Sequence, residues 1–330
     1  MQGKVESEHC AKPHNDAGID VCKAWLDVHI LPAGTAERVP NTRKGHAQLI
    51  TLLERHNVRR IVMEATGKFH RSVHVRMHQA GLHVAIVNPL RARLFAEAIG
   101  VLAKTDKVDA RMLAVMAGMT APNATPPLPE NLENLREIAR SREAATAHHT
   151  ALLNQLASAT INVVRRQIKR QIAATAAAIK ALAAAAIAAI KADPAFRRRH
   201  EILTSIPGFG DATATCLIAN MPELGKLDEK QAGMLAGLAP IACESGQTKG
   251  SRRIRGGRAV VRTGTYMGAL SAIQHNPPLT AFYDRLVAAG KPPKLAIAAV
   301  MRKLIVLANT LLKEDRRWSL ERPIAKPLPA

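Results

Sequence analysis

Aromatic residues are scarce, since Phe, Trp and Tyr together make up 3% of the 330 residues. Proteins that hold single-stranded nucleic acid by base stacking need exposed aromatic side chains, so this class is disfavoured. Acidic residues are also few: 47 Lys and Arg outnumber 26 Asp and Glu, and the formal net charge is +21. This excess favours a polyanionic partner, most simply nucleic acid. It is spread over residues 1–125, 126–200 and 201–330, which excludes a basic tail on a neutral enzyme.

Cysteine is rare as well. The chain has four cysteines, Cys10, Cys22, Cys216 and Cys243. None forms a Cys-x-x-Cys pair or a zinc-module spacing with histidine, so we expect free thiols in a reducing cytosol. The N-terminus lacks an apolar signal segment, and Lys180 interrupts the Ala-rich run at 172–190. We therefore predict a cytoplasmic protein with no membrane span and no membrane partner.

The 47% hydrophobic content allows sizeable cores and excludes a disordered polycation. Apolar segments with the pattern of strands lie within residues 17–31 (two strands), 59–67 and 83–89. Segments with the pattern of helices are 69–81, 91–100 and 105–119. The order strand, strand, strand, helix, strand, helix is typical of an RNase H-type α/β domain. We place this domain at 1–125, because a Pro-rich stretch follows at 122–130.

Residues 130–191 contain neither Pro nor Gly and are rich in alanine, which predicts one or two long helices. We expect an arm over 126–200, either an antiparallel or intermolecular coiled coil or a simple spacer bundle. Asp193-Pro194 ends the helical run. A mostly helical C-terminal domain is expected over 201–313, followed by a basic, Pro-containing tail over 314–330.

Four acids stand out in the first segment. Asp20 lies inside an apolar strand, Glu64 ends another strand, and Asp106 and Asp109 share one face at a helix start. A carboxylate among apolar residues is costly to bury unless a cation compensates it. Mg²⁺ prefers carboxylate oxygens, and two such ions about 4 Å apart stabilise phosphodiester cleavage. The pattern favours a site for two Mg²⁺ ions, with Mn²⁺ as a substitute, although Asp106 and Asp109 alone would also suit a helix N-terminus.

The C-terminal half carries two further candidates for contact with nucleic acid. Residues 203–219 read as a helix–hairpin–helix, in which the backbone N–H groups around Gly208 and Gly210 would bind a phosphate. A plain helical turn is the alternative. The segment 244–262 is rich in glycine and holds six cations, Lys249, Arg252, Arg253, Arg255, Arg258 and Arg262. These cations would wrap phosphates, or they would belong to a solvated basic loop.

Other motifs have less specific meanings. Arg165, Arg166, Lys169 and Arg170 on the arm are candidate nucleic-acid contacts. His70, His74 and His78 recur every four residues on a predicted helix, but no carboxylate or cysteine completes a metal set. We expect a stripe that faces solvent or RNA. No P-loop is present, so ATP is not implied.

The strings GID, EATG and residues 87–114 (VNPLRARLFAEAIGVLAKTDKVDARMLA) closely resemble one family. These are the insertion-sequence transposases with a DEDD-type, RuvC-like N-terminal domain, described as bridge-RNA-guided recombinases. The resemblance implies that Asp20, Glu64, Asp106 and Asp109 form the metal-binding tetrad. Residues 235–262 resemble the second domain of these transposases, in which a serine is the proposed nucleophile. That serine is Ser245 here, with Ser251 as the alternative.

The same resemblance implies partners and assembly. Donor and target double-stranded DNA would be recombined with a structured non-coding guide (bridge) RNA, through a covalent serine–DNA intermediate. A dimer or tetramer would combine the tetrad of one subunit with the serine of another, in the bacterial cytoplasm and at the nucleoid. Glu244 departs from the uncharged polar residue common before the serine. Two alternatives stay open: a metal-dependent junction nuclease without a covalent intermediate, and a non-catalytic nucleic-acid-binding protein.

Overall fold

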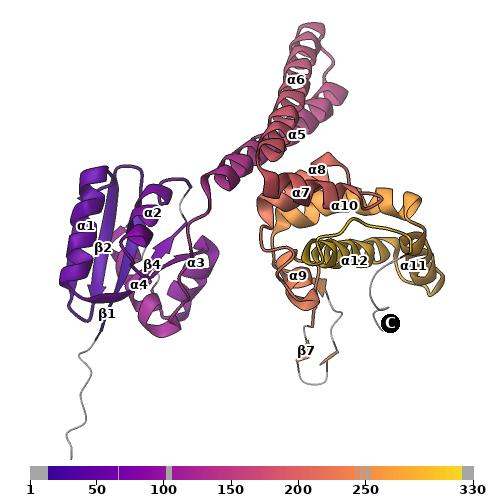
Figure 1. Cartoon of the computed structure of the whole chain (residues 1–330). Coiled ribbons are helices and arrows are strands. Elements are labelled where there is room, and N and C mark those ends of the chain that lie inside the picture. The colour runs from indigo at the N-terminus through magenta and orange to yellow at the C-terminus, as the bar shows by residue number, and fades with distance from the viewer. Residues whose placement is uncertain are drawn as a thin grey trace, which may run out of the picture. The chain divides into compact units, whose positions relative to one another are not determined.

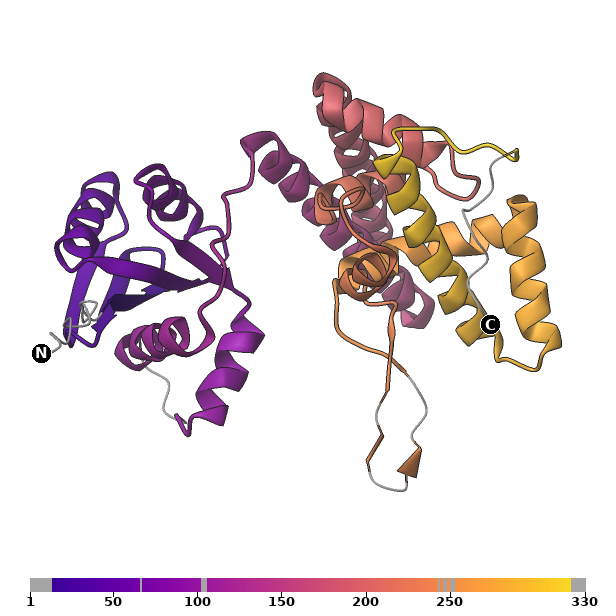
Figure 2. The same cartoon turned by 60° about the horizontal axis from the view of Figure 1, so that its bottom comes forward.

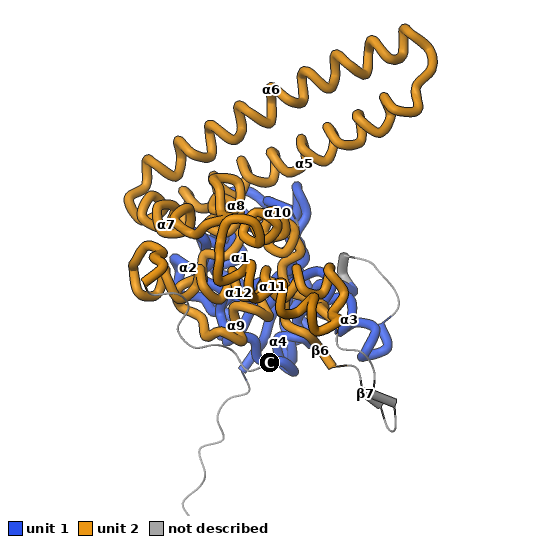
Figure 3. The backbone as a smooth tube through the Cα atoms, turned by 90° about the vertical axis from the view of Figure 1, so that its right-hand side faces the viewer, with its two compact units in different colours: residues 1–128 blue, residues 129–330 orange. Residues whose placement is uncertain are grey.

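A computed structural model describes residues 14–65, 67–101, 106–242, 244–245, 248–249 and 253–321. The side chains of 106–107, 244–245 and 248–249 lie outside the described part, as do Cys10, Cys243, Ser251 and Arg252. The chain divides into two compact units, residues 1–128 and 129–330 (Figure 3).

The first unit contains a five-stranded mixed sheet. Its strands are β1 Asn15–Val21, β2 Trp25–Leu31, β3 Thr35–Pro40, β4 Val58–Glu64 and β5 Val84–Val87. The spatial order is β3-β2-β1-β4-β5. β1 and β3 pair with β2 in antiparallel fashion, and β4 is parallel to both β1 and β5. The sheet is mixed and is covered by helices, so the predicted α/β class is confirmed for this unit.

Helices cover both faces of the sheet (Figure 2). They are α1 Arg43–Arg55, α2 Arg71–Gln79, α3 Pro89–Ala98 and α4 Asp106–Thr120. Successive side chains of a strand point to opposite faces. Ile19 and Met63 are buried in the core with residues of α1 and α2, whereas Val62 packs with residues of α3 and α4.

The sequence prediction lacks β3 and α1. Three successive residues of β3, Ala36 to Arg38, are exposed, because β3 is an edge strand. An edge strand need not alternate between apolar and polar residues, so its sequence pattern is weak. Helix α1 begins where the Thr42 side chain accepts a hydrogen bond from the Gly45 backbone N–H. Helix α1 follows β3 after a connection of two residues. Both elements lie within residues 32–58, where the sequence analysis predicts no element.

The Pro-rich stretch after α4 lies along the edge strand β5. The Thr125 backbone N–H donates to the Val84 carbonyl oxygen at 2.8 Å, and His83 Nε2 lies 2.9 Å from the Pro122 carbonyl oxygen. His74 Nε2 lies 2.7 Å from the Thr125 carbonyl oxygen, and His74 is 5% exposed. The expected stripe of three histidines that faces solvent or RNA is therefore wrong for His74, which anchors this stretch from inside the unit, whereas His78 is exposed.

The second unit is mostly helical, as expected. Its helices are α5 Glu130–Ser158, α6 Asn162–Ala192, α7 Pro194–Thr204, α8 Asp211–Asn220, α9 Glu229–Leu235, α10 Ala259–His275, α11 Pro277–Ala288 and α12 Pro293–Lys313. Helices α5 and α6 lie side by side (Figures 1 and 3). The predicted segments 126–200 and 201–313 share one compact unit. One reason is that Leu135 of α5 is buried in the same core as α8 and α12, and Arg136 Nε donates to the Ala219 carbonyl oxygen at 2.6 Å.

Two helices, α6 and α12, are long and apolar enough to cross a membrane by length and composition. The most apolar stretch of α12 is 61% buried inside the unit, so α12 is explained as its core helix. The corresponding stretch of α6 is 6% buried and contains the Ala-rich run for which the sequence predicts no span. Core helices of soluble proteins pass the same test, so this finding is weak evidence for a membrane protein.

Candidate active site

Two of the predicted acids lie on neighbouring strands at one end of the sheet. Asp20 is near the end of β1 and Glu64 is the last residue of β4. The preceding residues, Ile19 and Met63, are paired in the parallel register, so Asp20 and Glu64 lie side by side. Because side chains alternate, both acids are on the face opposite the Ile19 and Met63 side chains. That is the face covered by α4.

Helix α4 packs directly on this face because Gly18 has no side chain. A Cβ atom at Gly18 would lie 2.1 Å from the Ala110 carbonyl oxygen and 2.2 Å from the Ala114 nitrogen. Near the other end of the helix, a Cβ at Gly118 would lie 3.3 Å from Asp16 Oδ2. The order of these contacts shows that α4 runs antiparallel to β1. The first turn of α4, which contains Asp109, therefore comes to the end of the sheet that carries Asp20 and Glu64.

We call Asp20, Glu64 and Asp109 the carboxylate edge. Asp106 is the first residue of α4, but its side chain is outside the described part. Asp20 Oδ1 accepts a hydrogen bond from the Val21 backbone N–H at 2.9 Å. Among the side chains that the structure describes, no three His, Cys, Asp or Glu are grouped closely enough to hold a metal ion. The oxygen-only donor set of this edge fits a hard cation such as Mg²⁺ better than a zinc ion.

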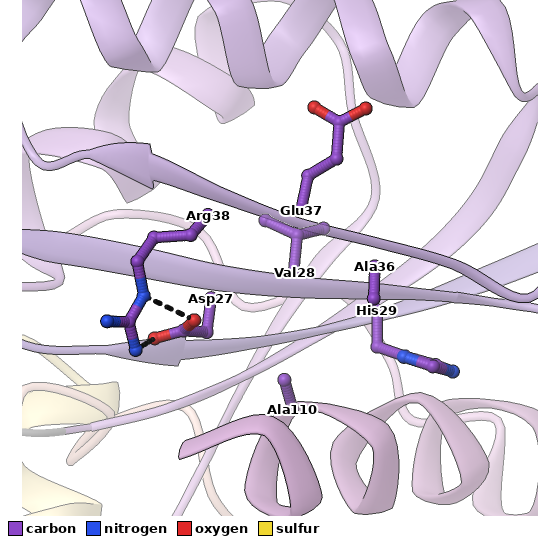
Figure 4. Close-up of a pocket in the computed structure, with 7 residues that line it drawn as sticks. All are labelled: Asp27, Val28, His29, Ala36, Glu37, Arg38 and Ala110. Atoms are coloured by element: carbon purple, nitrogen blue, oxygen red, sulfur yellow. Dashed lines mark hydrogen bonds and ion pairs between the residues drawn. The ribbon is translucent and has the colours of Figure 1, made fainter.

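An ion pair between a buried aspartate and an exposed arginine, which the sequence prediction missed, lies beside the carboxylate edge. Asp27 of β2 is directly opposite Asp20, and Arg38 of β3 is directly opposite Asp27. Arg38 Nε and Nη2 each donate to one Asp27 oxygen at 2.8 Å (Figure 4). The pair borders a cavity of about 470 Å³ lined by Asp27, Val28, His29, Ala36, Glu37, Arg38 and Ala110. Burial, and then the charge of Arg111, lower the pKa of His29.

Ser245 belongs to a short hairpin in the second unit. β7 Glu244–Ser245 pairs with β8 Thr248–Lys249, and Ser245 is opposite Thr248. The base of the loop is held by β6 Pro240–Ile241 and β9 Arg253–Ile254, which pair with each other. The side chains of Arg253 and Arg255 are exposed next to this base.

Two arginines predicted to contact phosphates have partners within the chain. Arg258 Nη1 and Nη2 donate to the two carboxylate oxygens of Glu223 at 2.7 Å, and Nη1 also donates to the Asn220 carbonyl oxygen. Arg262 Nη1 donates to the carbonyl oxygens of Gly256 at 3.0 Å and Gly237 at 3.3 Å. We call residues 242–257, between β6 and the start of α10, the serine loop. These bonds fasten the end of the serine loop to the helical core. They give both residues a structural role that sequence spacing does not show.

The basic residues of the arm differ among themselves. Arg165 Nη1 donates to the Ala159 and Leu156 carbonyl oxygens at 2.6 and 3.2 Å, which satisfies the C-terminal end of α5. The remaining three predicted contacts are exposed on α6, namely Arg166, Lys169 and Arg170. Of the four predicted contacts on the arm, these three are therefore the accessible ones.

The two glycines of the turn between α7 and α8 have different surroundings. Gly208 has φ +103°, and a Cβ there would lie 2.6 Å from the Ala272 Cβ of α10. The Phe209 N–H donates to the Ile206 carbonyl oxygen at 2.9 Å. A Cβ at Gly210 would meet nothing within 4 Å. Close packing against α10 therefore explains why residue 208 is a glycine. The backbone at Gly210 has no such neighbour, so it is the one that a phosphate could approach.

Comparisons with known proteins define the class. A family model described as Transposase matches residues 17–161, a range that contains the carboxylate edge. A second model, described as Transposase IS116/IS110/IS902 family, matches residues 200–284, a range that contains Ser245. The chain is thus a DNA transposase or recombinase. It belongs to the IS116/IS110/IS902 family of transposases, which confirms the resemblance drawn from the sequence.

The relatives span nearly the whole chain. Pilin gene-inverting proteins of Moraxella bovis and Moraxella lacunata are each 26% identical to it over 315 residues, which is 91% of this chain and 96% of the relative. Among solved structures, RuvC of T. thermophilus in complex with a Holliday junction substrate is similar, with 15% identity and a TM-score of 0.26. That match covers 34% of this chain and 100% of the RuvC chain.

Proposed function

We propose that this transposase moves an insertion sequence by cutting and rejoining DNA through two groups, the carboxylate tetrad and Ser245. The observation that carries the proposal is the carboxylate edge: β1, β4 and α4 bring Asp20, Glu64 and Asp109 to one end of the sheet. In this assignment residues 1–125 are the catalytic RuvC-like domain and 126–200 are a coiled-coil arm. Residues 201–313 carry the serine, and 314–330 form a basic tail.

Asp20, Glu64, Asp106 and Asp109 would hold two Mg²⁺ ions, or Mn²⁺ in their place. The ions would supply charge stabilisation to the attacking and leaving oxygens of the scissile phosphate. The protein's part is to fix the carboxylates: two are on neighbouring strands, and α4 supplies the others from its first turn. The direct contact of α4 with Gly18 fixes the distance between helix and sheet.

Ser245 would act as the nucleophile. Its oxygen forms a bond to phosphorus and loses its proton, while the bond from phosphorus to the DNA 3′ oxygen breaks and that oxygen takes up a proton. The products are a 5′-phosphoserine link and a free 3′ hydroxyl, which can attack the link in the rejoining step. The exposed Arg253 and Arg255 would stabilise the charge on the phosphate. Ser251 is the alternative nucleophile.

The partners in this proposal are donor and target double-stranded DNA and a structured guide RNA. The net charge of +21 and the 3% aromatic content suit duplex backbones and folded RNA, with sequence read by base pairing. A homo-oligomer would join the tetrad of one subunit to the serine of another, in the cytoplasm at the nucleoid. The exposed Arg166, Lys169 and Arg170 of α6 suit an RNA or DNA contact.

The test follows covalent protein–DNA adducts with end-labelled donor DNA and co-purified RNA. Ser245→Ala is expected to abolish the adduct while the RNA stays bound, and Ser251→Ala is the matched control in the same loop. Asp20→Asn is expected to abolish both the adduct and strand cleavage. Adducts that persist in Ser245→Ala and vanish in Ser251→Ala would assign the nucleophile to Ser251. Cleavage to a free 5′ phosphate without any adduct would support a metal-dependent junction nuclease instead.

The proposed binding of a guide RNA is tested separately from the serine chemistry. Sequencing of the nucleic acid that co-purifies with the full chain is expected to give one defined non-coding RNA. A random mixture of cellular RNA would contradict RNA guidance and leave the serine chemistry to be judged by the adduct assay.

A further inference from the structure

We propose that Arg38 and Asp27 are a positioning pair for the carboxylate edge: Arg38 holds Asp27 away from Asp20 and sets the net charge there. The inference rests on the proposed metal site, which it deepens. Neither residue belongs to the predicted tetrad. Both lie on the hairpin strands β2 and β3, beside the acids and not among them.

The strand register places the pair. Asp20 is paired with Asp27, and Asp27 is paired with Arg38. Residues directly opposite each other on neighbouring strands share a face, with Cβ atoms about 4.5–5.5 Å apart. Two carboxylates in this arrangement repel each other, and the repulsion destabilises the pair of strands. The sheet therefore carries a fifth acid next to Asp20 that requires compensation.

Arg38 supplies that compensation with fixed geometry. Its Nε and Nη2 atoms bond both oxygens of Asp27 at 2.8 Å, and Asp27 is 6% exposed (Figure 4). A bidentate pair of this kind fixes orientation as well as charge. Because both Asp27 oxygens are engaged on the β3 side, Asp27 is held as a neutralised neighbour of Asp20 and not as a fifth cation ligand.

The same strand offers a matched control. Asp16 of β1 is paired with Arg60 of β4, and Arg60 Nε and Nη2 donate to the two Asp16 oxygens at 2.9 Å. This pair has the same chemistry on the same face. The two aspartate side chains are similarly buried, whereas the Arg60 side chain is 15% exposed and the Arg38 side chain is 47% exposed. It lies four residues from Asp20, about 13 Å along the strand. That distance exceeds the Debye length of about 8 Å at physiological salt.

The two single substitutions should change the charge at the edge in opposite directions. Asp27→Asn removes one negative charge next to Asp20, so the edge becomes more positive and should bind a divalent cation about fivefold more weakly. Arg38→Gln leaves Asp27 unbalanced, so the edge becomes more negative and should bind the cation about fivefold more tightly. The double variant Asp27→Asn/Arg38→Gln restores the net charge and should return to the wild-type affinity. A purely structural pair would give shifts of one sign.

The experiment measures Mn²⁺ binding to the full chain from the electron paramagnetic resonance signal of free Mn²⁺. Thermal unfolding in metal-free buffer is recorded for every variant. Asp16→Asn and Arg60→Gln are expected to lower the unfolding temperature without changing Mn²⁺ affinity. Opposite shifts for Asp27→Asn and Arg38→Gln that cancel in the double variant are the expected result. Shifts of the same sign, or none beyond those of the Asp16 and Arg60 variants, would overturn the inference.

Asp20→Asn separates this inference from the proposed function. If Asp20→Asn loses Mn²⁺ and the Asp27 and Arg38 variants do not shift affinity, the metal site stands and the positioning pair is rejected. If Asp20→Asn binds Mn²⁺ as the wild type does, the metal site itself is rejected, and the positioning pair with it.

Discussion

Arg258 bonds both carboxylate oxygens of Glu223 at 2.7 Å and so ties the start of α10 to the segment after α8. A third bond, to the Asn220 carbonyl oxygen, also measures 2.7 Å. The serine loop ends just before Arg258, so this pair anchors one end of the loop. A residue that the sequence predicts as a phosphate contact is thus part of the scaffold that holds the loop.

The first prediction concerns the free energy of unfolding of Arg258 variants. Arg258→Ala leaves Glu223 without its charged partner and should cost about 1–3 kcal/mol. The lower end is expected, because the Glu223 side chain is 41% exposed and solvent screens the pair. Urea unfolding of Arg258→Ala, Glu223→Ala and the double variant measures the coupling.

Arg255→Ala is the control for this prediction. Arg255 is exposed, so its removal should leave stability unchanged and weaken DNA binding. An Arg258→Ala variant with wild-type stability and a DNA affinity reduced as in Arg255→Ala would instead make Arg258 a phosphate contact.

The second prediction concerns acid sensitivity at Glu223. Burial raises the pKa of Glu223, but hydrogen bonds from Arg258 and the backbone, with the charges of Arg258 and Arg136, more than offset this, so the pKa lies below its usual value. An acid with a lowered folded-state pKa adds stability that is fully present above its unfolded pKa of about 4.3. That stability is lost as pH falls through the folded value. The difference in unfolding free energy between wild type and Glu223→Gln should therefore be constant above about pH 5 and shrink below pH 4. A difference that grows in acid would contradict the pairing.

Much of the fold follows from local patterns. The strand periodicity of residues 17–31 predicts β1 and β2, and the absence of Pro and Gly over 130–191 predicts the long helical segment that forms α5 and α6. The edge strand β3 is missed because three of its residues are exposed and carry no periodic signal. The role of His74 is missed because its partner, the Thr125 carbonyl oxygen, is 51 residues away in sequence.

The candidate site also has residues that local sequence patterns predict and residues that they do not. Asp20 stands out in the sequence because apolar residues flank it, and a carboxylate buried among them is costly unless a cation or hydrogen bonds compensate its charge. Asp27 has equally apolar neighbours in WLDVHIL, so the same argument applies to it. The role of Asp27 depends on the strand register, which places it between Asp20 and Arg38. The spacing of residues in the sequence does not determine that register. The partner of Arg258 depends likewise on the packing of α8 against α10.

The third prediction compares the two glycines of the α7–α8 turn. Gly208→Ala would add a Cβ in the left-handed region and 2.6 Å from the Ala272 Cβ, so it should destabilise the second unit by about 2–4 kcal/mol. Gly210→Ala meets nothing within 4 Å and should leave stability nearly unchanged. Thermal unfolding and DNA binding of both variants check this. Weaker DNA binding by the stable Gly210→Ala variant would support a phosphate contact at this turn, and unchanged stability of Gly208→Ala would contradict the described packing against α10.

The fourth prediction concerns the contact that brings Asp109 to the carboxylate edge. In Gly18→Ala the new Cβ would overlap main-chain atoms of α4 at 2.1 and 2.2 Å, and no side-chain rotation can relieve a clash with backbone. Helix α4 must therefore move away from β1, at a cost of at least about 3 kcal/mol, the upper end for overpacked cores. Its first turn would move with it, so cleavage should be lost even at temperatures where the variant is folded.

Gly118→Ala is the matched control at the other end of the same helix–strand contact. Its Cβ would lie 3.3 Å from Asp16 Oδ2, a side-chain atom that can shift slightly, so stability should change by less than about 1 kcal/mol. Urea unfolding and DNA cleavage of both variants, compared below their unfolding temperatures, give the measurement. Wild-type stability in Gly18→Ala would show that α4 does not lie against β1. Loss of cleavage in both variants alike would show that the loss does not come from movement of the first turn of α4.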